Sequence, residues 1–168
     1  MKVKFIDLFA GMGGIRLGFE QAFQERGIKT ECILTSEIKP YAVQALKDNF
    51  KQDNLVGDIC KIDAKSIPDF DVLLAGFPCQ AFSTAGKGLG FLDTRGTLFF
   101  EVERILREKQ PYGFILENVE GLVLHDRESN KDKYFTGKDG FKGISENQGF
   151  YLSSGNVVIY FQVYEIAP

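Results

Sequence analysis

The stretch VKFIDLFAGMGGIRLGFEQAF at residues 3–23 decides the fold. Its first seven residues form a short apolar run that is typical of a strand buried in a sheet. Glycines at positions 11, 13 and 14 predict a turn, and the segment 15–23 carries apolar residues at helical spacing, namely Leu17, Phe19, Ala22 and Phe23. A strand, a glycine turn and a helix in this order predict one βα unit.

The same alternation continues along the chain. It predicts further strands at residues 31–35, 54–56, 71–75 and 112–116, and further helices from Pro40 and over about 97–108. In the last helix, Glu103 and Arg107 are spaced to form an ion pair. Residues 150–166 return to β-rich composition, with 157–161 as the best strand candidate. Such regular alternation predicts an α/β fold with a doubly wound, mostly parallel, Rossmann-like sheet.

The composition is that of an ordinary globular protein, with 168 residues, 44% hydrophobic residues and 26% charged residues. We expect one domain over 1–168, with an irregular loop region at 125–149. Three cysteines without CxxC spacing predict neither a disulfide framework nor a metal site, and they fit a reducing, cytoplasmic compartment. No apolar run approaches the ~20 residues of a membrane span. The net charge of −3 lacks the basic excess usual for nucleic-acid binders.

The segment Gly76–Ser83, GFPCQAFS, places Cys79 in a proline-led turn directly after the strand at 71–75. Loops at the carboxyl ends of parallel strands are where α/β proteins build sites, so Cys79 is a candidate nucleophile. The alternative is a structural role, because unpaired cysteines are usually buried and behave as small hydrophobic residues. Cys32 and Cys60 lack the turn setting, and we interpret both as structural.

Two acidic residues follow strand ends beyond the glycine turn. Glu37 is expected where an acidic side chain commonly bonds ribose hydroxyls, and Asp58 is placed to bond the amino group of an adenine. Arg16 stands three positions after Gly13, so the turn does not have the GxGxxG dinucleotide pattern. Each carboxylate alone is more often a solvated surface group. Together with the turn they predict a site for an adenosine-containing cofactor.

Glu117 ends the strand expected at 112–116, and we expect it at the same mouth of the sheet as Cys79. A carboxyl group whose pKa is raised by burial there could donate a hydrogen bond or a proton to a ring nitrogen. A helix cap or a solvated glutamate is the alternative.

Five blocks, in this order, resemble the DNA (cytosine-5)-methyltransferase family, and the bacterial restriction-modification type in particular. The blocks are FIDLFAGMGG at 5–14, GDI at 57–59, GFPCQAFS at 76–83, RGTLFF at 95–100 and ENV at 117–119. The resemblance covers residues 3 to about 126. It implies the fold of S-adenosylmethionine-dependent methyltransferases. It leaves open whether this chain is truncated at the last strands of that sheet.

The resemblance implies methyl transfer from S-adenosylmethionine to carbon 5 of a flipped-out cytosine in double-stranded DNA. It assigns Cys79 a covalent bond to carbon 6 of the ring, and it assigns Glu117 the protonation of ring nitrogen 3. The cofactor residues that it implies are Phe5, Asp7, Gly11, Gly13, Glu37, Asp58, Ile59, Pro78 and Leu98. The catalytic loop and its support would include Gln80, Ser83, Arg95 and Asn118. Ile38 stands where family members often carry an aromatic residue.

The family continues with an arginine-bearing QxRxR block and a target-recognition domain. After residue 126 this chain has one arginine, Arg127, and no such block. We therefore expect the chemistry to need a complementing subunit that carries the target-recognition domain, or a missing C-terminal part. The alternative is a catalytically inactive, truncated module that still binds S-adenosylmethionine. A generic Rossmann-like oxidoreductase is a third and more remote reading.

Overall fold

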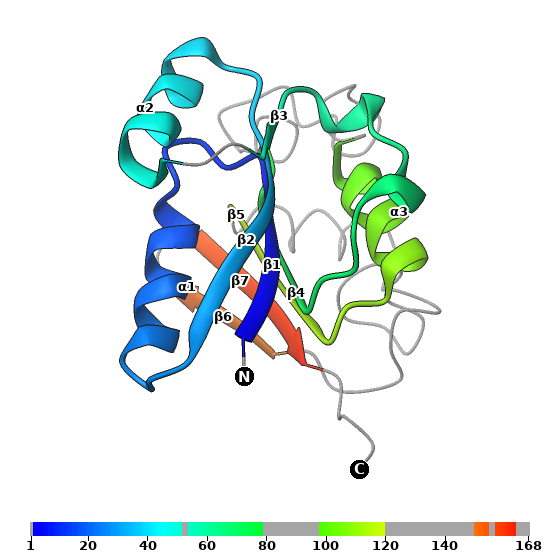
Figure 1. Cartoon of the computed structure of the whole chain (residues 1–168). Helices are drawn as coiled ribbons and strands as arrows, with labels where there is room; N and C mark the ends of the chain where they lie inside the picture. The colour runs from blue at the N-terminus through cyan, green and yellow to red at the C-terminus, as the bar shows by residue number, and fades with distance from the viewer. Residues whose placement is uncertain (1, 52–53, 79–97, 120–149, 155–156, 164–168) are drawn as a thin grey trace.

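The structure is a computed structural model and describes residues 2–51, 54–78, 98–119, 150–154 and 157–163 (Figure 1). Several predictions lie outside these residues. They are the turn position of Cys79, the loop residues Gln80, Ser83 and Arg95, and the irregular region at 125–149.

The described elements follow the predicted alternation closely. In chain order they are β1 (Lys2–Leu8), α1 (Gly14–Gln24), β2 (Lys29–Ser36), α2 (Pro40–Phe50), β3 (Leu55–Val56), the short 3₁₀ turns η1 (Ile59–Lys61) and η2 (Ala64–Ser66), β4 (Val72–Gly76), α3 (Leu98–Lys109), β5 (Gly113–Val119), β6 (Phe150–Ser154) and β7 (Val157–Val163). Each predicted strand and helix up to β5 is confirmed to within a few residues at its ends.

The strands form one sheet in the order β3-β2-β1-β4-β5-β7-β6. The first five strands in this order pair in parallel, whereas β7 runs antiparallel to both β5 and β6. In Figure 1, α1 and α2 lie on one side of the sheet and α3 lies on the other. The doubly wound, mostly parallel sheet is thus confirmed, and β7 and β6 extend it beyond β5. From β1 the chain adds β2 and β3 on one side of the sheet and then β4 and β5 on the other. The switch point therefore lies between β1 and β4, where such folds bind ligands.

The pleat of β1 divides the core between the two faces of the sheet. Ile6 and Leu8 pack in the larger cluster, which α3 covers with its buried residues Phe99, Val102, Ile105 and Leu106. Val3 and Phe5 point to the other face, against Phe19 of α1. Among the described helices, none is long and apolar enough to cross a membrane.

The buried face of α1 differs from the prediction. Leu17 and Ala22 are exposed, whereas Arg16 and Phe19 are buried. The Arg16 guanidinium stacks on the Phe50 ring, 4.1 Å from its centroid, and its Nε donates to Glu20 at 2.9 Å. An arginine can occupy a buried position when an aromatic face and a carboxylate replace the water around it.

In α3 the buried residues are Phe99, Val102, Ile105 and Leu106, whereas Leu98 at its first position lines a cavity described below. The predicted ion pair is confirmed, with Arg107 Nη2 at 2.6 Å from Glu103 Oε1.

Candidate functional site

A cavity of about 360 Å³ opens at the carboxyl ends of the parallel strands, within the size range of small-ligand sites. Six of the predicted cofactor residues line it, namely Gly11, Glu37, Asp58, Ile59, Pro78 and Leu98. Phe9, Ser36, Ile38, Lys39 and Gly76 complete the lining. Because parallel strands end at one edge of the sheet, residues far apart in the sequence meet here.

The Glu37 carboxylate accepts hydrogen bonds from two backbone segments at this edge of the sheet. Its Oε2 accepts the N–H of Gly11 at 2.8 Å, and its Oε1 accepts the N–H groups of Ile38 and Lys39, each at 2.8 Å. A carboxylate offers about four lone-pair positions, so three described donors leave room for one more, on Oε2. Glu37 is therefore both a structural anchor for the glycine turn and a possible acceptor for a ligand hydroxyl.

The turn after β1 needs its glycines for different reasons. Gly11 has a φ of 56° and lines the cavity, so its backbone lies close to any ligand there. Gly13 has a φ of 86° and does not line the cavity. A Cβ at Gly13 would overlap the ring of Phe50 from α2. Gly13 therefore permits the close packing of the turn against α2, rather than a contact with the cavity.

Asp58 and Ile59 form another part of the cavity wall. Asp58 precedes η1, and its Oδ1 accepts the Cys60 N–H at 3.0 Å. This hydrogen bond from the backbone of Cys60 lowers the pKa of Asp58 below its ordinary value, so the group is ionised at neutral pH. Ile59 is buried and adds an apolar surface beside that charge.

Asp7 lies in β1 beneath the turn and is only 1% exposed. Neither carboxylate oxygen has a hydrogen-bond partner among the described residues, and the same holds for Arg16 Nη1 nearby. Burial raises the pKa of Asp7 to about 7, and the positive charge of Arg16 opposes that rise. Asp7 is not one of the residues that line the cavity.

Glu117 and Asn118 lie at the end of β5. Glu117 pairs in register with Gly76 of β4, and burial raises the pKa of Glu117 above its ordinary value. Asn118 is buried, and its Nδ2 donates to the carbonyl oxygen of Phe77 at 2.9 Å. Asn118 therefore holds the backbone immediately before Pro78.

The structure does not bring Phe5 to the cavity. Its ring has no exposed surface and packs 4.9 Å from the ring of Phe19, on the α1 face of the sheet. Phe9 also lines the cavity, although it is not among the predicted site residues, and it follows β1 with a φ of 55°. Its place at the very end of the apolar run, next to the glycine turn, was the available signal.

The two described cysteines differ from each other. Cys32 is partly buried, and its Sγ lies 3.3 Å from Thr35 Oγ1, in keeping with a structural role. Cys60 is exposed, so the structural interpretation of that residue was wrong. Within the described ranges, no group of three or more His, Cys, Asp and Glu side chains could hold a metal ion.

Comparison with known proteins gives a consistent result. The family model described as C-5 cytosine-specific DNA methylase matches residues 3–137. The chain is 58% identical over 152 residues to Type II methyltransferase M.NgoBV of Neisseria gonorrhoeae, which covers 90% of this chain and 36% of that protein. It is 60% identical over 127 residues to Type II methyltransferase M.BanI of Aneurinibacillus aneurinilyticus, covering 76% and 29% respectively. The chain spans about a third of the length of these curated relatives.

Among solved structures, S. pombe Dnmt2 methyltransferase superposes with a TM-score of 0.63 at 16% identity, over 100% of this chain and 51% of that chain. At this identity the likeness establishes the fold alone.

Proposed function

Because the chain belongs to the C-5 cytosine-specific DNA methylase family, we propose that it supplies the cofactor site and catalytic groups for methylation of carbon 5 of cytosine in double-stranded DNA. Enzymes of this family are DNA methyltransferases that use S-adenosylmethionine. One observation carries the proposal for this chain: Gly11, Glu37 and Asp58 meet in a single cavity at the switch point of the sheet.

The lining of the cavity fits an adenosine-containing cofactor. The remaining lone pair on Glu37 Oε2 can accept a hydrogen bond from a ribose hydroxyl, and the ionised Asp58 can accept one from the adenine amino group. Ile59, Pro78 and Leu98 offer apolar surface for the adenine ring. The exposed Ile38 offers a smaller flat surface than an aromatic side chain would.

S-adenosylmethionine supplies a methyl group bonded to a positively charged sulfur. In the proposed reaction the Cys79 thiolate bonds to carbon 6 of a flipped-out cytosine while Glu117 donates its proton to ring nitrogen 3. Carbon 5 would then form the bond to the methyl group as the methyl–sulfur bond breaks, and S-adenosylhomocysteine would leave. A base would take the proton from carbon 5, the bond from carbon 6 to Cys79 would break to give back the thiolate, and ring nitrogen 3 would return its proton to Glu117, which restores the ring. Burial raises the pKa of Glu117, and this is the direction that favours a role as proton donor.

In the relatives, most of the polypeptide lies outside the matched region. We propose that methyl transfer needs a target-recognition domain that binds the DNA and reads its sequence. A complementing subunit or further polypeptide would supply this domain. The Type II names of the relatives favour a restriction-modification role, on DNA in the cytoplasm.

A reconstitution experiment tests this proposal. The chain is first titrated with S-adenosylhomocysteine in a calorimeter, and is then mixed with unmethylated DNA, tritiated S-adenosylmethionine and the part of M.NgoBV outside the matched region. Binding followed by tritium on carbon 5 of cytosine is the expected result. Binding without transfer in any mixture favours the alternative of an inactive binding module. The absence of binding contradicts the proposal.

A further inference from the structure

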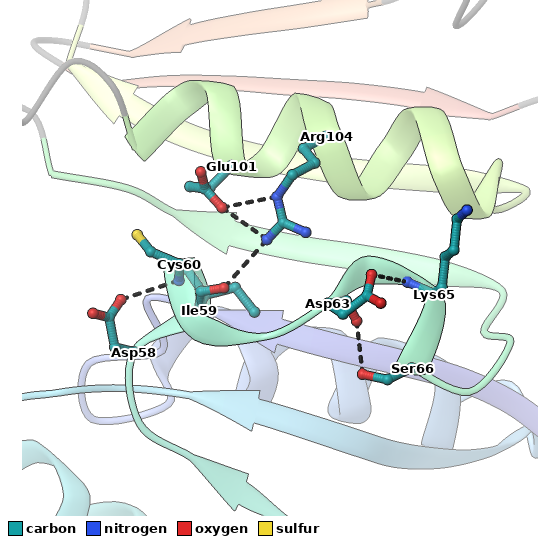
Figure 2. Close-up of polar contacts among 8 residues, drawn as sticks. All are labelled: Asp58, Ile59, Cys60, Asp63, Lys65, Ser66, Glu101 and Arg104. Carbon is teal, nitrogen blue, oxygen red and sulfur yellow. Dashed lines mark hydrogen bonds and ion pairs between the residues drawn. The ribbon is translucent and has the colours of Figure 1, made fainter.

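The side chain of Arg104 in α3 donates a hydrogen bond to the backbone of η1, at the wall of the cavity (Figure 2). Arg104 Nη2 donates to the carbonyl oxygen of Ile59 at 3.3 Å. The same guanidinium donates from Nε and Nη2 to Glu101 Oε2, at 2.9 and 2.7 Å. Glu101 thus orients a guanidinium that reaches across to the backbone of η1.

The backbone of η1 lies outside the sheet, and its Ile59 side chain is buried in the core cluster that α3 covers. The sheet pairing before it is the two-residue β3, and the chain pairs in the sheet again only at β4. Within η1 the backbone bonds run from Lys61 N–H to the Asp58 carbonyl and from Ile62 N–H to the Ile59 carbonyl, both at 3.1 Å. Such short 3₁₀ turns have poorer hydrogen-bond geometry than an α-helix and need support from their surroundings.

The neighbouring turn η2 offers a comparison. It has the same kind of cap, with Asp63 Oδ1 accepting the Lys65 N–H at 3.0 Å, and Ser66 Oγ donates to the Asp63 carbonyl at 2.7 Å. Figure 2 shows both turns under α3, with the dashed contact to the helix at η1. Both turns lie against α3, and the turn that accepts the hydrogen bond from Arg104 is the one whose residues line the cavity.

The bond joins two elements that line the cavity. Asp58 and Ile59 line it from η1, and Leu98 lines it from the first residue of α3. We propose that Arg104 is a positioning residue, which holds η1 against α3 and so sets the place of Asp58 and Ile59 in the cavity. The inference rests on the proposed function only in taking the occupant of the cavity to be S-adenosylmethionine.

The same helix contains a matched control. Arg107 donates from Nε and Nη2 to Glu103 Oε1 at 3.0 and 2.6 Å, and the two arginine side chains are 48% and 35% exposed. Exposed ion pairs contribute little by themselves. Among the described residues, the hydrogen bonds of Arg107 go to Glu103 and not to η1, so R107M removes a similar pair without the bond to Ile59.

Amide hydrogen exchange on the chain without cofactor tests the structural step. In R104M the amides of Cys60, Lys61 and Ile62 should exchange about fivefold to tenfold faster than in the wild-type chain, since a hydrogen bond from a charged donor is lost. R107M should leave them unchanged. E101A keeps the arginine but removes its anchor, and should give an intermediate acceleration. Equal exchange in R104M, E101A and the wild type would overturn the inference.

Calorimetry with S-adenosylhomocysteine tests the functional step. R104M should weaken binding about threefold to tenfold, while R107M binds as the wild type does. Equal weakening by both variants would show a general effect of α3 and would also overturn the inference. If the wild-type chain binds no cofactor, the proposed function fails, and the exchange experiment still decides whether Arg104 holds η1.

Discussion

Gly76 and Glu117 are direct neighbours across β4 and β5, and the glycine leaves the room that the carboxyl group occupies. A Cβ at Gly76 would lie 3.2 Å from Glu117 Oε2 and 3.1 Å from Ile15 Cδ1. A proposed proton donor thus depends on the absence of a side chain in the adjacent strand.

We therefore predict that Gly76→Ala displaces Glu117 and lowers the rate of methyl transfer in the reconstituted system by about tenfold or more. The crowding should also cost about 1 kcal/mol in the free energy of unfolding, measured with urea. Gly18→Ala is the control, because a Cβ there meets nothing within 4 Å and alanine favours the helix. A fully active Gly76→Ala enzyme would contradict the proposed dependence.

Gly13→Ala should destabilise the chain strongly, by about 2 kcal/mol or more in urea unfolding. The new methyl group would overlap the Phe50 ring, and the φ of 86° is strained for any residue with a side chain. The adjacent Gly14→Ala is the matched control, since open space surrounds its Cβ position. Equal stability of the two variants would mean that α2 does not pack on the turn as described.

Glu37→Gln should weaken the binding of S-adenosylhomocysteine by about tenfold or more and destabilise the chain by about 1–3 kcal/mol. The amide replaces one acceptor oxygen with a donor, so at least one of the partly buried N–H donors of Gly11, Ile38 and Lys39 loses its hydrogen-bond partner. Glu31→Gln, at an exposed ion pair with Lys2, should change neither quantity. Calorimetry and urea unfolding measure the two effects, and unchanged cofactor binding would exclude Glu37 from the site.

The stability of the chain should depend on pH through Asp7. Burial raises the pKa of Asp7 from 3.8 to about 7, so the folded state binds the proton more tightly than the unfolded state does. This stabilising contribution is complete below about pH 4, declines as the pH rises toward 7, and is lost above it. Urea unfolding from pH 4 to 8 should show that decline in the wild type and a flatter profile in Asp7→Asn. Parallel profiles would refute the assignment.

Cys79→Ser should abolish methyl transfer in the reconstituted system while leaving the binding of S-adenosylhomocysteine within about twofold of the wild type, since a hydroxyl is a far weaker nucleophile than a thiolate. Cys60→Ser is the control, because Cys60 is an exposed thiol beside the cavity wall. Retained transfer by Cys79→Ser would refute the covalent step.

The sequence alone determined the βα alternation and the strand ends that carry Gly11, Glu37 and Asp58. Those signals are local: apolar periodicity defines each element, and a parallel sheet brings its carboxyl ends to one edge. The i,i+4 pair Glu103–Arg107 is equally local, and it is confirmed.

Only the tertiary structure decided which aromatic residue reaches the cavity, because the pleat turns Phe5 toward α1 and leaves Phe9 at the mouth. It also decided that Arg16 is buried against Phe50, that β7 runs antiparallel beside β5, and that Arg104 reaches Ile59. Each of these joins segments 34 or more positions apart in the sequence. Local periodicity carries no information on such pairings, which depend on how the folded elements pack against each other.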